Sequence, residues 1–445
     1  MANRQIVKRN GSIVSFDREK ITEGIYRAAA SVGGHNRSIS ESLTDEIFQV
    51  IEETFSPNRE LRVDEIQEIT EKVLIERGHA KTAKAYILYR DYRRREREQR
   101  IAGRAKDAPL PWQTMWEALA WNLEHGCESF EKLNQIIRTG RLPWLVRESD
   151  KRYNEGILHA ADLILSKTGK IKLIIIAGPS SSGKTTTTAK LTQRLHQHGV
   201  DAVLLNLDHY FFNLEIHPKD EFGDYDFETP EALDLPLINE HLEKLVNGEP
   251  VQMPQYDFKT GKRSTETKTM SVKPNQVILI DTLHGLYEPL TQSISNDRKF
   301  KVYIEPISQI KNNHGRFVRW TDIRMLRRMI RDNLYRGYNP EQTIGHWHYV
   351  RRSEQKHIIP FLRSADIVLN GALPYEFPYL KKYAFDYFPN TIEQWKNNYK
   401  RQDGYKRAVR VFDMLGQIES FEDESIIPDD SLIREFIGGS VYKLH

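Results

Sequence analysis

The residues best suited to chemistry in this 445-residue chain follow the apolar run "KLIIIA" at residues 172–177. Gly178 and Gly183 bracket four residues and precede Lys184 and Thr185, which gives the pattern GxxxxGK[ST]. Such a loop, between a strand and a helix, turns backbone N–H groups toward an anion, and its lysine and hydroxyl serve the outer phosphates and Mg²⁺. The motif predicts an ATP site formed by Gly178, Ser180, Ser181, Ser182, Gly183, Lys184, Thr185 and Thr186.

Two acidic residues end the apolar runs that come next along the chain. Asp208 ends "AVLLNLD" and Asp281 ends "VILID". Because the carboxyl ends of parallel strands share one edge of a sheet, we expect both carboxylates beside the phosphate loop. One can hold Mg²⁺ with Thr185, and the other can accept the proton of an attacking hydroxyl. The alternatives are a helix cap or an ion pair.

An arginine-rich segment suggests a lid. Residues 319–337, "RWTDIRMLRRMIRDNLYRG", place five arginines on one expected helix that ends at Gly337. They are Arg324, Arg327, Arg328, Arg331 and Arg336. Arginines that close over the γ-phosphate would neutralise charge and exclude water. We expect two of the five to act in this way and the others to be solvated.

The elements that position these residues alternate between short apolar runs and helical segments after Lys170. The runs "LIIIA", "AVLLNL", "VILI", "KVYIEP" and "ADIVLNG" predict buried strands. Their alternation with helices predicts an α/β fold, a parallel sheet with helices on both faces. Residues 106–170 read as packed helices, and we expect Trp112, Trp116, Trp121 and Trp144 in their core. The role of "SLIREFIGGS" near the end of the chain stays open.

The first residues predict a small α+β module. Asn10-Gly11 separates two apolar runs, as in a tight hairpin, and helical periodicity follows Asp17. The mixed-charge run at residues 90–100 is more typical of a solvated helix end than of a nucleic-acid patch.

Composition limits the function classes. Lysine and arginine nearly balance aspartate and glutamate at a formal net charge of +3, so no general field favours nucleic acid or an anionic membrane. A single cysteine, Cys127, excludes an internal disulfide and suits a reducing compartment. No apolar stretch is long enough to span a membrane or to form a signal peptide. We expect a cytoplasmic protein that has no nucleic-acid or membrane partner.

Residues 172–375 resemble the uridine kinase and phosphoribulokinase family of P-loop kinases, most closely its uridine–cytidine kinases. The matching segments are "GPSSSGKTT", "LDHYF", "YDFETPEALDLPLINEHLEKLVNGEPVQMPQYDFKTGKR", "VILIDTLHGLY" and "RRMIRDNLYRG". The resemblance implies that Asp208 is the catalytic base and that Asp281 is on the Mg²⁺ side. It further implies that Asp226 and Arg331 bind the ribose, that Tyr256 stacks near the base and that Arg336 belongs to the lid.

One departure from that family concerns base recognition. Gly261 stands where uridine–cytidine kinases carry a histidine that reads the pyrimidine edge. A missing polar contact removes discrimination between bases, so thymidine becomes a candidate beside uridine and cytidine. His346 and Trp347 could compensate, although ordinary packing is the simpler interpretation. A metal site at His346, His348 and His357 is disfavoured because the spacing offers no carboxylate or thiolate ligand.

The N-terminal module resembles an ATP-cone, the regulatory nucleotide-binding domain of ribonucleotide reductases. The match covers "VKRNGSIVSFDREKI" and "VDEIQEITEKVLIERGHAKTAKAYILYR". By position, the resemblance implies nucleotide contacts from Val7, Lys8, Arg9 and Lys20, with ATP or dATP as effector. A plain solvated hairpin is the alternative.

We therefore expect an ATP-cone over residues 1–98, a helical connector over 99–170, a P-loop nucleoside kinase domain over 171–385 and a C-terminal helical extension over 386–445. The expected reaction transfers the γ-phosphoryl group of ATP, with Mg²⁺, to the 5′-hydroxyl of a ribo- or deoxynucleoside. Lys184, Asp208, Arg331 and Arg336 would carry it, and the cone would act through a homo-oligomer. The alternatives are a sugar-phosphate kinase like phosphoribulokinase and a nucleotide-sensing regulator without turnover.

Overall fold

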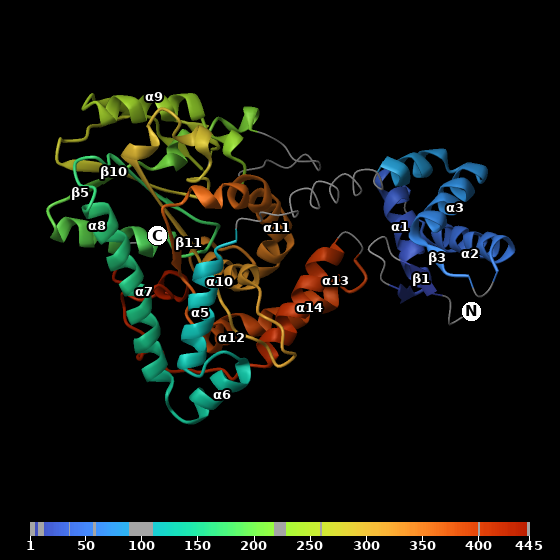
Figure 1. The fold of residues 1–445 in the computed structure, drawn as a ribbon. Coiled ribbons are helices and arrows are strands. Elements are labelled where there is room, and N and C mark those ends of the chain that lie inside the picture. Colours follow the sequence, from blue (N-terminus) through green and yellow to red (C-terminus); the bar gives the residue numbers. More distant parts are fainter. Residues whose placement is uncertain are drawn as a thin grey trace. The chain divides into compact units, whose positions relative to one another are not determined.

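The computed structural model describes residues 5–7, 13–34, 36–56, 59–88, 110–217, 228–258, 260–398 and 401–442. The chain forms two compact units, Met1–Ala108 and Pro109–His445 (Figure 1). Each unit has its own buried hydrophobic residues, and the larger unit contains the phosphate loop.

The smaller unit confirms the predicted hairpin. Strand β1 (Gln5–Val7) pairs antiparallel with β2 (Ile13–Ser15), while the turn residues Asn10 and Gly11 lie outside the described residues. The sequence did not predict β3 (Leu61–Arg62), which runs parallel to β1 and is too short to show a period. Helices α1 (Arg18–Ser31), α2 (Arg37–Thr54), α3 (Val63–Glu76) and a helix over residues 80–88 complete the unit.

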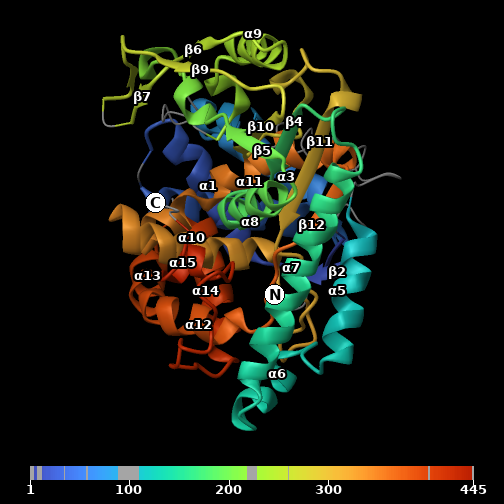
Figure 2. The ribbon, with the colours of Figure 1, turned by 90° about the vertical axis from the view of Figure 1, so that its left-hand side faces the viewer.

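The larger unit contains the predicted parallel sheet. Its strand order is β12-β11-β4-β10-β5, and every described pairing is parallel (Figure 2). The strands are β4 (Leu173–Ala177), β5 (Asp201–Leu204), β10 (Gln276–Thr282), β11 (Lys299–Glu305) and β12 (Ile367–Asn370). All five apolar runs singled out in the sequence contribute a strand. The phosphate loop leaves the carboxyl end of β4, so this edge of the sheet is the place for the site.

The strands are buried on both faces. In β4, Ile174 and Ile176 belong to one hydrophobic core, whereas Leu173, Ile175 and Ala177 belong to another. Successive side chains of a strand point to opposite faces, which explains the uninterrupted apolar runs. Helix α9 (Leu235–Val246) covers one face, and α7 (Leu142–Leu165), α8 (Lys184–Gln197) and α10 (Trp320–Arg336) cover the other (Figures 1 and 2).

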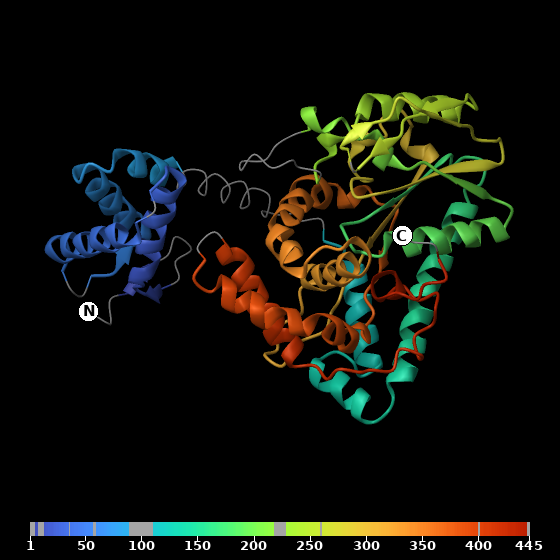
Figure 3. The same cartoon turned by 180° about the vertical axis from the view of Figure 1, so that it is seen from behind.

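Further helices add side chains to the same core, and the view from behind shows this side of the larger unit (Figure 3). They are α11 (Pro340–Ser353), α12 (Glu376–Ala384), α13 (Phe388–Trp395), α14 (Gln402–Gly416) and α15 (Arg434–Ile437). Two short antiparallel ribbons, β6 (Val251–Met253) with β9 (Lys268–Met270) and β7 (Tyr256–Asp257) with β8 (Lys262–Arg263), belong to the α9 side of the molecule.

Helices α5 (Trp112–Glu124), α6 (Phe130–Arg138) and α7, in the segment expected to connect the two domains, pack into the same core as the sheet. Trp121 and Trp144 lie against that core. The expectation was wrong for Trp112 and Trp116, which are 64% and 70% exposed because they lie on the outer face of α5. Among the described residues, no helix has the length and apolar character that a membrane span requires.

Candidate active site

The phosphate loop needs both of its glycines. A Cβ atom on Gly178 would lie 2.4 Å from the carbonyl oxygen of Ile304. Gly183 has φ +99°, a left-handed conformation that favours glycine, and it is the N-cap of α8. Ser181 and Ser182 are buried, and their hydroxyls have no hydrogen-bond partner among the described residues. The loop thus presents unpaired polar groups at a helix N-terminus, the arrangement that binds an anion.

Lys184 and the two predicted acids influence one another electrostatically. Burial raises the pKa of Asp281 to about 6, and the ammonium of Lys184 opposes that rise. Burial also raises the pKa of Asp208, again opposed in part by Lys184. The charge of Asp208 in turn raises the pKa of Asp281. The charges of the two acids and of Lys184 therefore act on one another at this edge of the sheet.

The two acids differ in how the backbone carries them. Asp281 is the penultimate residue of β10, paired in register with Ile176 of β4. Asp208 does not end a strand, because β5 stops at Leu204 and Asp208 lies on the 3₁₀ turn η1 (Leu207–Tyr210). The side chain of Asn206 caps this turn by accepting the N–H of Asp208 at 3.0 Å. A rigid turn thus holds the candidate base.

The oxygen ligands available near the loop suit a hard cation such as Mg²⁺. Asp281 supplies a half-buried carboxylate, and Thr185 is a half-buried hydroxyl residue in the first turn of α8. The hydroxyl that donates to Asp281 is that of Thr188, with 3.3 Å between Thr188 Oγ1 and Asp281 Oδ2. Thr188 is one helical turn beyond Lys184 and was not among the predicted site residues.

Helix α10 ends at Gly337 as predicted, but its arginines are not the solvated set that we expected. Arg324 and Arg327 are fully buried in ion pairs with Glu354 and Glu376, respectively. Arg324 also donates to the carbonyl oxygen of Ser180 at 3.2 Å. Burial of these guanidinium groups requires charged partners that lie far away in the sequence, and a local pattern does not reveal them.

The other arginines of α10 are less deeply buried. Arg328 donates to Ser180 Oγ at 3.3 Å, and Arg331 donates to Asp332 at 2.9 and 2.7 Å. The side chain of Arg336 is 49% exposed, and its positive charge partly opposes the rise in the pKa of Asp208 that burial causes. Arg336 is therefore a cation that faces the candidate base from α10.

An aromatic cluster adjoins the turn that carries Asp208. The N–H of Tyr256 donates to His209 Nδ1 at 3.2 Å, and the Tyr256 ring lies 5.7 Å from that of Phe211 and 5.0 Å from that of Phe258. The hydroxyl of buried Tyr256 has no partner within the described part of the chain. Asp226, expected to bind the ribose, lies outside the described residues.

The structure explains the glycine that replaces the expected base-reading histidine. Gly261 has φ +69°, and its backbone bonds to Asp257 and Leu214 in the turn between β7 and β8. A side chain at this position would be strained and would meet Leu214 at 3.1 Å. His346 is exposed and Trp347 is buried beneath Arg324, which favours the packing interpretation for Trp347.

In the smaller unit, Val7 lies at the end of β1, where its side chain is half-buried. Lys20 is exposed on α1 and forms an ion pair with Asp17 at 3.0 Å. Lys8 and Arg9 lie outside the described residues.

Besides Thr188, sequence reasoning missed the C-terminal helix α15. Its Glu435 accepts hydrogen bonds from Thr186 of the phosphate loop. No spacing within "SLIREFIGGS" signals this contact, because its partner lies 249 positions away.

Comparisons with known proteins match this chain to two families. Residues 173–373 match the model of the phosphoribulokinase / uridine kinase family, and residues 4–95 match that of the ATP cone domain. A uridine kinase of Deinococcus deserti is 30% identical over 205 residues, which cover 45% of this chain and 89% of that protein. A uridine kinase-like protein 5 of Arabidopsis thaliana is 29% identical over 44% of this chain and 38% of its own length. A solved structure of a possible uridine kinase from Bacillus stearothermophilus is 17% identical, covering 48% of this chain and 98% of that one, with a TM-score of 0.34.

Proposed function

Because this chain belongs to the phosphoribulokinase / uridine kinase family, we propose that it is an ATP-dependent nucleoside kinase that a nucleotide at its ATP-cone regulates. The observation that carries the proposal is the placement of two acids at the edge of the sheet that holds the phosphate loop: Thr188 of α8 donates to Asp281, and the turn after the neighbouring strand β5 carries Asp208. The phosphate-binding cradle, formed by residues 178–186, would by itself suit any NTPase. A second carboxylate beside the cradle suits transfer to a hydroxyl.

In this mechanism the carboxylate of Asp208 accepts the proton of the nucleoside 5′-hydroxyl. The freed oxygen attacks the γ-phosphorus, the bond from that phosphorus to the β–γ bridging oxygen breaks, and ADP leaves. Lys184, Arg331 and Arg336 would stabilise the charge on the transferred group, and the cluster around Tyr256 would receive the base. Thr185 and Asp281 would hold Mg²⁺, which neutralises phosphate charge when it is bound.

A panel of ribo- and deoxynucleosides and ribulose 5-phosphate, assayed with Mg·ATP, tests the proposal. We expect turnover of at least one nucleoside, and we expect Asp208→Asn to lower kcat by about 10²- to 10⁴-fold with ATP affinity retained. Asp201→Asn is the matched control, since Asp201 is a part-exposed acid of β5 that pairs with His196. Turnover of ribulose 5-phosphate alone would assign the chain to the sugar-phosphate kinases, and ATP binding without any turnover would make it a sensor.

The buried ion pairs of α10 bear on the sugar-phosphate alternative. Three of the five arginines that could have bound an acceptor phosphate, Arg324, Arg327 and Arg328, are already paired with Glu354, Glu376 and Glu228. The surplus of positive charge that favoured that alternative in the sequence is therefore much reduced.

A further inference from the structure

Glu435 makes an unusual contact with the phosphate loop. This residue of the four-residue helix α15 is 3% exposed. Its Oε2 accepts the backbone N–H of Thr186 at 2.9 Å and the hydroxyl of Thr186 at 2.8 Å. A buried carboxylate from the C-terminal segment thus takes two donors of the helix that follows the loop.

Those donors are among the ones that a phosphate would use. Thr186 is the third residue of α8, and the first backbone hydrogen bond of this helix is donated by Thr187, to Gly183. The N–H of Thr186 therefore belongs to the set at a helix N-terminus that lacks an intrahelical acceptor. Burial lowers the pKa of Lys184 and raises that of Asp281; the charge of Glu435 opposes the first shift and adds to the second. Glu435 consequently faces the same cradle as the lysine and the acid.

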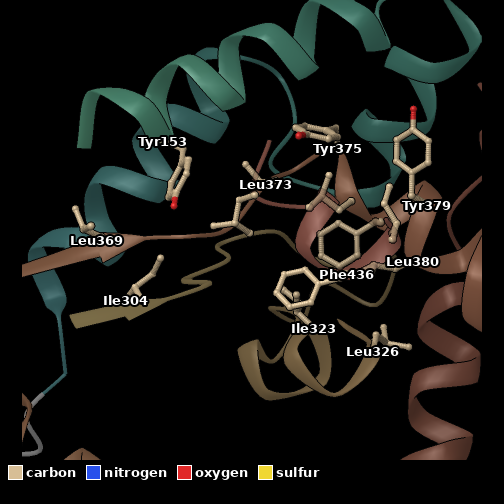
Figure 4. Packing of buried hydrophobic residues seen from close by; sticks show 14 of the residues in the cluster. Tyr153, Ile304, Ile323, Leu326, Leu369, Leu373, Tyr375, Tyr379, Leu380 and Phe436 are labelled. Atoms are coloured by element: carbon tan, nitrogen blue, oxygen red, sulfur yellow. The ribbon is translucent and has the colours of Figure 1, made fainter. Parts of the chain in front are cut away.

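The segment that carries Glu435 is firmly packed. Leu432 lies against Gly183, where an added Cβ would come within 2.5 Å of its Cδ1 atom. Asp430 forms an ion pair with Lys190 of α8, and Ser431 donates to Asp150 of α7 at 2.8 Å. Phe436 is fully buried among side chains of α10 and α12 (Figure 4). The contact at Thr186 is thus part of a packed interface between the C-terminal segment and the phosphate loop.

A bound triphosphate and the carboxylate of Glu435 would repel each other and compete for the same donors. Both are anions that seek the same N–H and hydroxyl donors, and Asp281 already adds a negative charge to the pocket. We propose that Glu435 is an internal competitor of ATP: its carboxylate occupies phosphate donors in the resting protein, and nucleotide binding displaces it. This inference rests on the proposed role of the cradle as the ATP site.

Such a contact acts as an autoinhibitory device. The apparent affinity for ATP equals the intrinsic affinity multiplied by the fraction of molecules in which the donors are free, so it is lower than the intrinsic one. Because Ser431 and Tyr375 both bond to Asp150, the segment is tied to α7, and displacement of Glu435 would be felt there.

The test is a calorimetric titration of the full-length chain with Mg·ATP. Lys184→Ala identifies the cradle, since the heat that this variant loses belongs to that site and not to the ATP-cone. For Glu435→Gln, which keeps the shape and removes the charge, we expect the dissociation constant of the cradle site to fall about tenfold. Asp430→Asn, which loosens the segment at Lys190, should shift it in the same direction.

The matched control is Glu422→Gln, because Glu422 is an exposed acid near the same terminus that pairs with Lys382. It should leave the dissociation constant unchanged. If both Glu435→Gln and Asp430→Asn bind ATP as tightly as the wild type or more weakly, the inference is wrong. If Glu435→Gln does not fold, the result for Asp430→Asn is the test. The titration needs no acceptor, so a chain that phosphorylates no nucleoside would refute the proposed function and still test this contact.

Discussion

Arg324 and Glu354 form a buried bidentate ion pair behind the phosphate loop, with 2.9 Å between Arg324 Nη2 and Glu354 Oε2. The same guanidinium donates to Ser180 O. One side chain thus joins the core of α10 to the loop that would hold ATP. The site and the fold share this contact, so its loss should affect both.

We expect Arg324→Met to lower the free energy of unfolding by about 3–5 kcal/mol, because it leaves a buried carboxylate without its main partner. Arg336→Met is the control, since Arg336 is half-exposed and should contribute about 1 kcal/mol or less. Denaturant titration of both variants measures the difference. Equal losses would mean that the buried pair is not the stabilising element.

Tyr256 should recognise the acceptor through its ring. We expect Tyr256→Ala to raise KM for the nucleoside about tenfold or more, in line with base–aromatic stacking of roughly 1–3 kcal/mol, with KM for ATP unchanged. Tyr256→Phe keeps the ring and should stay within about twofold of the wild type. If Tyr256→Phe is as impaired as Tyr256→Ala, the hydroxyl and not the stacking surface makes the contact.

Asp150 should make stability depend on pH. Burial raises its pKa to about 6, against the effect of hydrogen bonds from Ser431 and Tyr375. Between pH 4 and 6, Asp150 keeps its proton in the folded chain and releases it in the unfolded chain. The protonated side chain therefore stabilises the fold in acid, and this stabilisation is lost as the pH rises through 6.

The measurement compares the wild type with Asp150→Asn at several pH values. We expect the unfolding free energy of the wild type, relative to the variant, to fall by about 2 kcal/mol from pH 4 to pH 7. Asp162→Asn, at an exposed position of the same helix, should show no such trend. A flat difference for Asp150→Asn would refute the assignment.

The ATP-cone should couple to turnover. We expect dATP to lower the rate of a working kinase by at least about fivefold, the lower range of allosteric coupling energies, and to change its assembly size. Lys8→Ala should abolish both effects, and Lys72→Ala, on an exposed lysine of α3, should leave them intact. Enzyme assays with size-exclusion chromatography measure them, and an undiminished response in Lys8→Ala would remove the proposed nucleotide contact.

Local residue patterns determined the parts of this protein that depend on neighbours in the sequence. The strands around Ile174 and Ile280, the loop from Gly178 to Thr185 and the end of α10 at Gly337 all follow from apolar runs, glycine conformation and helix periodicity. The position of Asp281 near the carboxyl end of β10 also followed from its apolar run, whereas Asp208 lies beyond the end of β5 on the turn η1.

Only the tertiary structure decided which charges are paired. Arg324 and Arg327 look like solvated lid residues in the sequence, yet they are buried against acids that other helices supply. Glu435 reaches Thr186 from a remote segment, and Trp112 and Trp116 face outward on a helix whose pattern suggested a core. Burial and ion pairing depend on which segments come together in space, and the spacing of residues along the chain does not reveal which segments those are.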